Sequence, residues 1–312
     1  MISWRYHVVS IVAVVLAFGL GILAGTSVIG EGFARELQKN YDEAVRQRDA
    51  ALSQVALYER FAEALQPSLR DDLLSGEEAV IVTSEGVDRP ARQTADALTA
   101  AGVDVLATLE LTRRLAEPEI ADSAAVLEGI LGLSGSDPDT LRTGVANALA
   151  ERLAVGGLGA DGDVLGDLLA GGFVTADRDL EADALLGIGG GGQLVVVAAG
   201  GSQPTRSPPA AALLVPFTER LVRLDAPTAA VGPTDDAYGF VSAIRDTSEI
   251  PDCSMVTVDD IDLVGIGGIT LAMGIDRLRD DPDPAFRSGG DYGIRGDSIV
   301  PGVADPPDSC RR

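Results

Sequence analysis

The pattern of hydrophobic and polar positions divides the chain into four stretches of different character. The first stretch, residues 8–29, reads VVSIVAVVLAFGLGILAGTSVI and contains no charged residue, no Asn or Gln and no proline. A helix rises about 1.5 Å per residue, so a stretch of this length spans the ~30 Å hydrocarbon core of a bilayer. The pattern therefore predicts a transmembrane helix over residues 8–29.

The residues before this helix predict its orientation. Arg5 and His7 precede it without any acidic residue, whereas an acid-rich chain follows. Positively charged flanks stay in the cytoplasm, so we expect residues 1–7 to be a cytoplasmic tail and the bulk of the chain to be extracytoplasmic. Small residues at 24–26 are also typical of a signal-peptide cleavage site, but the apolar stretch is longer than a signal-peptide core. We therefore expect an uncleaved single-pass anchor in the cytoplasmic (inner) membrane.

The second stretch, residues 31–66, has a helical pattern with a heptad repeat. Apolar residues recur at alternating steps of three and four, and the intervening positions are mostly charged or polar. This spacing predicts a coiled-coil stalk that ends before Pro67 and joins copies of the chain into a homo-oligomer. The alternative is a helix that packs on its own domain. The predicted interface residues are Leu37, Tyr41, Ala44, Ala51, Val55, Tyr58 and Leu65.

In the third stretch, residues 73–279, short apolar runs alternate with helical patterns. Alternation of this kind predicts an α/β domain with a parallel sheet. We expect a degenerate Rossmann-like domain with a helical insertion at about residues 117–186. The predicted strands lie at 79–83, 103–109, 194–199, 228–231 and 254–258.

The last stretch, residues 280–312, is rich in Pro, Gly, Asp and Ser. Such a composition buries too little apolar surface to offset the loss of chain entropy. We therefore expect a largely disordered tail.

Charge and cysteine content narrow the classes of function. The formal net charge is -24, which argues against nucleic-acid binding, because phosphates attract basic surfaces. The two cysteines are Cys253 and Cys310. In an exported domain they are compatible with a disulfide, and two free thiols are equally compatible with the sequence.

Two motifs typical of enzymes occur without their usual context. The glycines of Gly187–Gly192 match the dinucleotide pattern GxGxxG but precede a predicted strand instead of following one, which indicates a flexible linker. The only lysine is in the stalk, which excludes a Walker phosphate loop, and the only histidine is His7. Because His7 is expected on the other side of the membrane, no Ser-His or Cys-His pair can form in the domain. We predict a protein that is not an enzyme.

Carboxylate pairs follow two of the predicted strands. Asp235–Asp236 and Asp259–Asp260 are explained by turn formation and helix capping, and Asp262 is expected to cap the last helix. If a crevice exists, it should lie beyond the carboxyl ends of the parallel strands. The candidate crevice residues are Ser84, Glu85, Gly200, Asp259 and Asp260.

Soft metal ligands are scarce outside the predicted membrane helix. Cys253 and Met255 are the only close pair, and two ligands do not form a high-affinity copper site. They are therefore weak candidates for metal ligands, and we predict no bound cofactor.

The opening residues 1–17, MISWRYHVVSIVAVVLA, resemble the start of the actinobacterial MctB-like family, which is named for copper transport. The segments 256–262 (VTVDDID) and 290–293 (GDYG) are similar to the C-terminal region of that family. The family pattern has a histidine before the Tyr-Gly pair, where this chain has Asp291. This departure removes a possible metal ligand.

The resemblance implies a location in the cell envelope and a part in copper transport or homeostasis. Corynebacterial SteB-type members are instead linked to cell separation through a partner membrane protein, which implies a non-enzymatic scaffold as the alternative. A pore needs several helices or a closed barrel, and one apolar span supplies neither. A third possibility from the α/β pattern is a small-molecule-binding or hydrolytic domain.

Overall fold

The computed structural model describes residues 4, 6–22, 38–41, 44–46, 48, 52, 55, 73–119, 122–157, 162–200, 209–234, 239–251, 253–263, 265–279, 289–294 and 296. The chain divides into two units, Met1–Tyr58 and Glu59–Arg312.

The first unit is helical wherever it is described. Residues 6–22 form a continuous helix whose side chains are exposed, including Val9 at 67%, Val14 at 65% and Phe18 at 72%. Within the described ranges, which stop at residue 22 and resume at residue 38 here, no helix combines the length and apolarity needed to cross a bilayer. Residues 23–29 of the predicted span lie outside those ranges, so the transmembrane helix stays a prediction.

The predicted stalk is described at ten positions only. All ten are helical, and among them Tyr41 is 65% exposed and Val55 is 42% exposed. Ala44 is exposed as well. The other predicted interface residues, Leu37, Ala51, Tyr58 and Leu65, lie outside the described residues. The coiled coil is neither supported nor contradicted by these positions.

The second unit is built on one mixed sheet. Among the described residues the sheet has seven strands in the order β3-β2-β1-β4-β5-β6-β7, and only β3 is antiparallel to its neighbour. The strands β2-β1-β4-β5-β6-β7 are parallel to one another, and β3 forms an antiparallel edge. The strands are β1 Glu78–Ser84, β2 Asp104–Leu111, β3 Val174–Ala176, β4 Leu194–Ala198, β5 Thr228–Val231, β6 Val256–Val258 and β7 Gly290–Tyr292.

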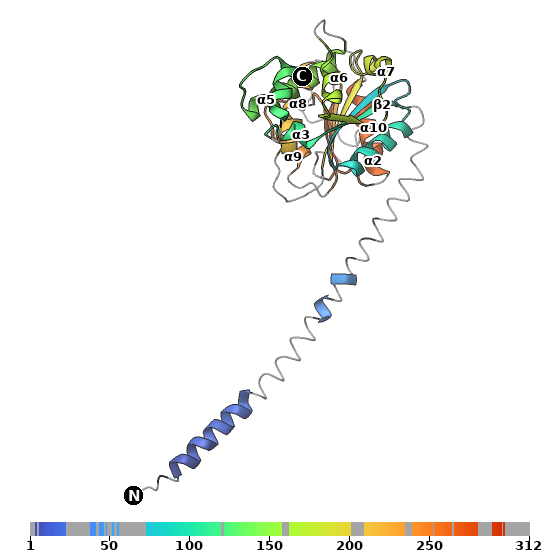
Figure 1. The fold of residues 1–312 in the computed structure, drawn as a ribbon. Helices are drawn as coiled ribbons and strands as arrows, with labels where there is room; N and C mark the ends of the chain where they lie inside the picture. Colours follow the sequence, from blue (N-terminus) through green and yellow to red (C-terminus); the bar gives the residue numbers. More distant parts are fainter. Residues whose placement is uncertain are drawn as a thin grey trace. The chain divides into compact units, whose positions relative to one another are not determined.

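Helices cover both faces of the sheet (Figure 1). On one face, α2 (Asp88–Ala100) and α10 (Ile266–Arg279) pack against alternate strand residues such as Ile81 and Val196. The opposite face, with Val82, is covered by other helices. Because successive side chains of a strand point to opposite faces, a strand buried on both faces is apolar throughout, as residues 79–82 of β1 and all of β4 are. The helices of the opposite face include α5 Pro138–Val155, α8 Pro209–Arg223 and α9 Phe240–Asp246.

The segment between β2 and β4 is only partly helical. It contains β3, which pairs antiparallel with β2 through Leu109↔Ala176. The predicted helical insertion at about 117–186 does contain helices, but the prediction did not include β3, because a three-residue edge strand is too short to have a recognisable alternation. The helices of this segment are α3 Arg113–Ala116, α4 Ser123–Leu131, α5, α6 Val164–Ala170 and α7 Ala182–Gly187.

The C-terminal region also differs from the prediction. Residues 290–292 form β7, which pairs in parallel with β6 through Thr257↔Asp291. The predicted disordered tail from residue 280 is therefore wrong for this segment. The reason is that a polar segment can be held by backbone hydrogen bonds to a neighbouring strand, as Gly290 N donates to Met255 O at 3.0 Å.

The glycine-rich segment is a packed turn. It precedes β4, and a Cβ at Gly189 would lie 2.6 Å from the Arg152 carbonyl oxygen at the end of α5. The Gln193 side chain closes the turn, accepting from Gly189 N at 2.7 Å and donating to Gly187 O at 2.8 Å. The prediction of a flexible linker is wrong, because these glycines allow two backbone segments to touch.

Candidate functional site

The carboxyl ends of the parallel strands place four of the five candidate crevice residues in structural contacts. Glu85, after β1, accepts the backbone N–H of Arg113 at 2.7 Å. Gly200, after β4, lies directly against Pro233, where a Cβ would be 2.1 Å from the proline Cδ. Ser84 is the last residue of β1, and its carbonyl accepts Val87 N at 3.1 Å. These residues line one edge of the sheet, where the Glu85 carboxylate and the Ser84 carbonyl accept hydrogen bonds from the backbone of the chain itself.

Arg245 on α9 donates hydrogen bonds to three groups of β6, β7 and the residue that follows β6. Its Nε donates to Thr257 Oγ1 at 2.7 Å, its Nη1 to Asp259 Oδ2 at 2.7 Å and its Nη2 to the Tyr292 carbonyl at 2.8 Å. Thr257 Oγ1 in turn donates to Asp291 Oδ1 at 2.7 Å. The planar guanidinium has donors in several directions, which suits it to join one helix to two strands. This cluster, Arg245, Thr257, Asp259 and Asp291, joins α9, β6 and β7.

Asp262 binds Thr234, which lies three residues after the end of β5. Its two carboxylate oxygens accept Thr234 N at 2.6 Å and Thr234 Oγ1 at 2.9 Å. The helix α10 begins four residues later, at Ile266. The prediction that Asp262 caps this helix is therefore wrong. Asp235 and Asp236 lie outside the described residues.

Asp260 differs from its neighbours because, among the described residues, none donates a hydrogen bond to its side chain. The residue is 1% exposed, and both carboxylate oxygens are buried without a hydrogen-bond partner. Burial, with a smaller contribution from the nearby carboxylates of Asp259 and Asp262, raises the pKa of Asp260 to about 7. An isolated buried carboxylate is strongly disfavoured, so the neutral acid is the form that this environment accepts.

The two weak candidates for metal ligands, Cys253 and Met255, both have structural roles. Cys253 is disulfide-bonded, so it offers no thiolate to a metal ion. Of the two alternatives that the sequence left open for this residue, a disulfide and a free thiol, the structure has the disulfide. Cys310 is outside the described residues. Met255 is 4% exposed and packs in the core on the α5 and α8 face of the sheet. In the part of the chain that is described, no three His, Cys, Asp or Glu side chains form a group suited to a metal ion.

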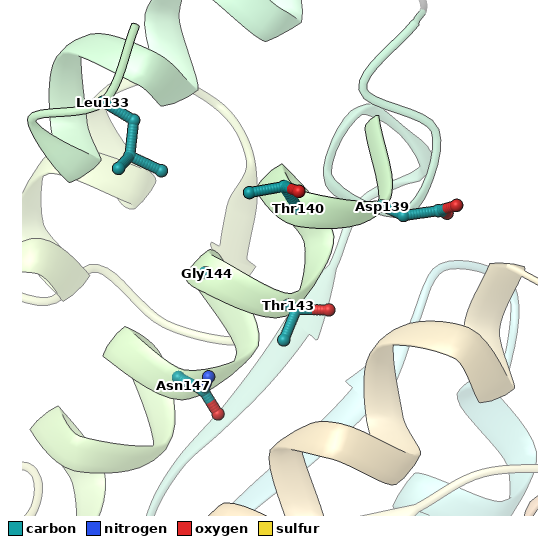
Figure 2. A pocket seen from close by; sticks show the side chains of 6 residues that line it. All are labelled: Leu133, Asp139, Thr140, Thr143, Gly144 and Asn147. Carbon is teal, nitrogen blue, oxygen red and sulfur yellow. The ribbon is translucent and has the colours of Figure 1, made fainter. Parts of the chain in front are cut away.

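A surface groove lies along α5, away from the residues discussed above. Side chains of α5, together with Leu133, line this groove (Figure 2). Its volume is about 460 Å³. Its only charged side chain, Asp139, forms an ion pair with Arg142 at 2.9 Å. The groove therefore combines the apolar side chain of Leu133 with mostly polar side chains on one face of α5, and its charged group, Asp139, is already paired. The lining residues are Leu133, Asp139, Thr140, Thr143, Gly144 and Asn147.

Sequence reasoning named Asp259 and Asp260 but missed Arg245, Thr257 and Asp291 as one cluster. The resemblance had already singled out segments 256–262 and 290–293, and the structure places them side by side through the β6–β7 pairing. No sequence pattern indicated a role for Arg245, because its contacts depend on where α9 packs.

These features define the class of protein. It is an α/β protein with helices on both faces of a largely parallel sheet, preceded by an apolar N-terminal helix. The chain belongs to the family described as copper transport outer membrane protein, MctB, whose model matches residues 1–298. No curated protein matches the chain. The family description associates the protein with copper transport and with the cell envelope.

Proposed function

We propose that this chain is a single-pass envelope membrane protein that takes part in copper homeostasis without being an enzyme. Residues 8–29 serve as the anchor, and the α/β unit lies outside the cytoplasmic membrane. The family match over residues 1–298 is the observation that carries this proposal.

The described helix supports the anchor. Residues 8–22 carry no charge, and their large apolar side chains are exposed on all sides of the helix, from Val8 at 38% to Phe18 at 72%. A helix that is apolar all round is typical of a membrane span or of a core, since water would otherwise meet a continuous hydrocarbon surface. Lipid is the environment that covers such a surface.

Deletion and relocation of the chain test the function. A strain lacking the protein should become copper-sensitive while dividing normally, and full-length protein should restore growth. A version in which Val14 and Phe18 are replaced by Asp should leave the membrane fraction and fail to restore growth. Normal copper tolerance of the deletion strain would refute the copper function, and unchanged membrane retention of the Asp variant would refute the anchor.

A second candidate function is a self-associating scaffold in cell separation or septal envelope assembly, acting with a membrane or envelope protein partner. Its support is the heptad pattern of residues 31–66 in the sequence, in which Tyr41 and Val55 occupy equivalent positions two heptads apart. Chained cells at ordinary copper concentrations would favour this function, whereas normal septation would count against it.

A further inference from the structure

Asp260 lies at a tightly packed corner between β6 and α10. Its own carbonyl accepts Leu263 N at 2.9 Å, and the next residue, Ile261, donates its N–H to Gly232 O at 3.2 Å. The first turn of α10 lies directly on this backbone, because a Cβ at Gly267 would be 2.3 Å from Asp260 O. We call residues 259–263 and 265–268 the β6–α10 corner. The position of α10 is therefore tied to the backbone that carries the unpartnered carboxyl.

The charged groups that face Asp260 do not neutralise it. Asp259 and Asp262 are on its own segment, and the facing cation is Arg245 from α9. That guanidinium is already bound to Asp259 at 2.7 Å. The end of β5 contributes Gly232 to Thr234, and the first turn of α10 contributes Ile266 to Gly268, none of which titrates.

We propose that Asp260 is a proton-dependent latch on the β6–α10 corner. When its carboxyl is protonated, the corner stays closed on the sheet; loss of the proton places an unpartnered charge among Asp259 and Asp262 and opens the corner. Opening brings the carboxylate to water, where it regains the solvation that the closed state denies. The corner would thus report the pH of the compartment in which the α/β unit lies.

Hydrogen exchange of the full-length protein in detergent micelles tests the latch. The opening constant of amides 261–268 is obtained after division by the intrinsic exchange rate at each pH. With a pKa of about 7 in the closed state and an ordinary pKa of 3.8 in the open state, this constant should rise about tenfold per pH unit between pH 5 and 7 and level off above pH 7. In Asp260→Asn the constant should be flat over this range.

Two controls keep the test decisive. Asp246→Asn makes the same substitution at an exposed position at the end of α9, and it should keep the wild-type pH dependence. If Asp260→Asn does not fold, the wild-type protein alone decides: the opening constants of amides 261–268 should be larger than those of the α2 amides at the same pH, because opening of the corner leaves α2 in place. A flat opening constant of amides 261–268 in the wild type, opening constants equal to those of α2, or an equal rise in Asp260→Asn, would overturn the proposal.

Discussion

Arg245 and Asp259 form an ion pair at 2.7 Å in which the two side chains are only 12% and 9% exposed. The pair joins α9 to the end of β6, and the same guanidinium holds β7 through the Tyr292 carbonyl. Since β7 has only three residues, this side-chain clamp supplements its backbone pairing.

Removing the arginine should therefore be costly. Arg245→Met keeps the length of the side chain but leaves Asp259 buried without its cation, and we expect a loss of about 3–5 kcal/mol in the free energy of unfolding. Urea unfolding followed by circular dichroism measures this loss. Arg223→Met is the matched control, because Arg223 pairs with Glu249 at the surface, with side chains 48% and 59% exposed. It should change stability by less than about 1 kcal/mol, and equal losses would contradict a buried clamp.

Global stability should depend on pH through Asp260. Its pKa is about 7 in the folded chain and 3.8 in the unfolded chain, so between these values the native state binds more protons than the unfolded state. The free energy of unfolding should fall by up to about 1.4 kcal/mol per pH unit between pH 4 and 7 and then level off. Asp260→Asn should remove this component, and an identical pH profile in the variant would contradict the assignment.

The glycine turn before β4 should tolerate no side chain where it touches α5. Gly189 has φ +84° and its Cβ would lie 2.6 Å from Arg152 O, so Gly189→Ala should destabilise the fold by at least about 1–3 kcal/mol. At Gly187, the last residue of α7, a Cβ would meet nothing within 4 Å. Gly187→Ala should leave the thermal midpoint nearly unchanged. Equal effects of the two substitutions would show that the turn is not packed.

Cys253 should be unreactive in the native protein. Because it is disulfide-bonded, maleimide should label it only after treatment with a reductant. Mass spectrometry of non-reduced peptides would identify the residue to which it is joined. Labelling of Cys253 without reductant, in protein isolated under oxidising conditions, would contradict the disulfide.

The stalk residues Tyr41 and Val55 should control self-association. Replacing both by Asp places charges in the predicted interface, and sedimentation should show smaller particles than for the wild type. Arg46→Asp is the control, since it changes the net charge by the same two units but lies on the opposite face of the heptad pattern. An unchanged sedimentation profile in the double variant would refute the predicted coiled coil.

Much of the α/β unit was predictable from local pattern. The apolar runs that became β1, β4 and β5 were found within one or two residues, because strands buried on both faces need uninterrupted apolar side chains. The strands β3 and β7 were missed, since three-residue edge strands are held by pairing with a neighbour more than by their own composition.

The candidate site was likewise predictable only in part. The position of Asp259 and Asp260 after a strand was readable from the sequence, but their opposite chemistry was not. Asp259 meets Arg245 and Asp260 meets no donor, because neighbouring side chains point in different directions from the backbone. Asp262 likewise binds Thr234, a residue 28 positions earlier, and does not cap the helix that follows it.

The sequence alone determined the apolar N-terminal stretch, the acidic balance and the alternation of strands and helices, because each depends only on which residues are near one another along the chain. Tertiary structure alone decided which glycines touch α5, which carboxylate is paired and which is left without a partner. Those properties depend on contacts between residues far apart in the chain, and burial determines how strongly each contact acts.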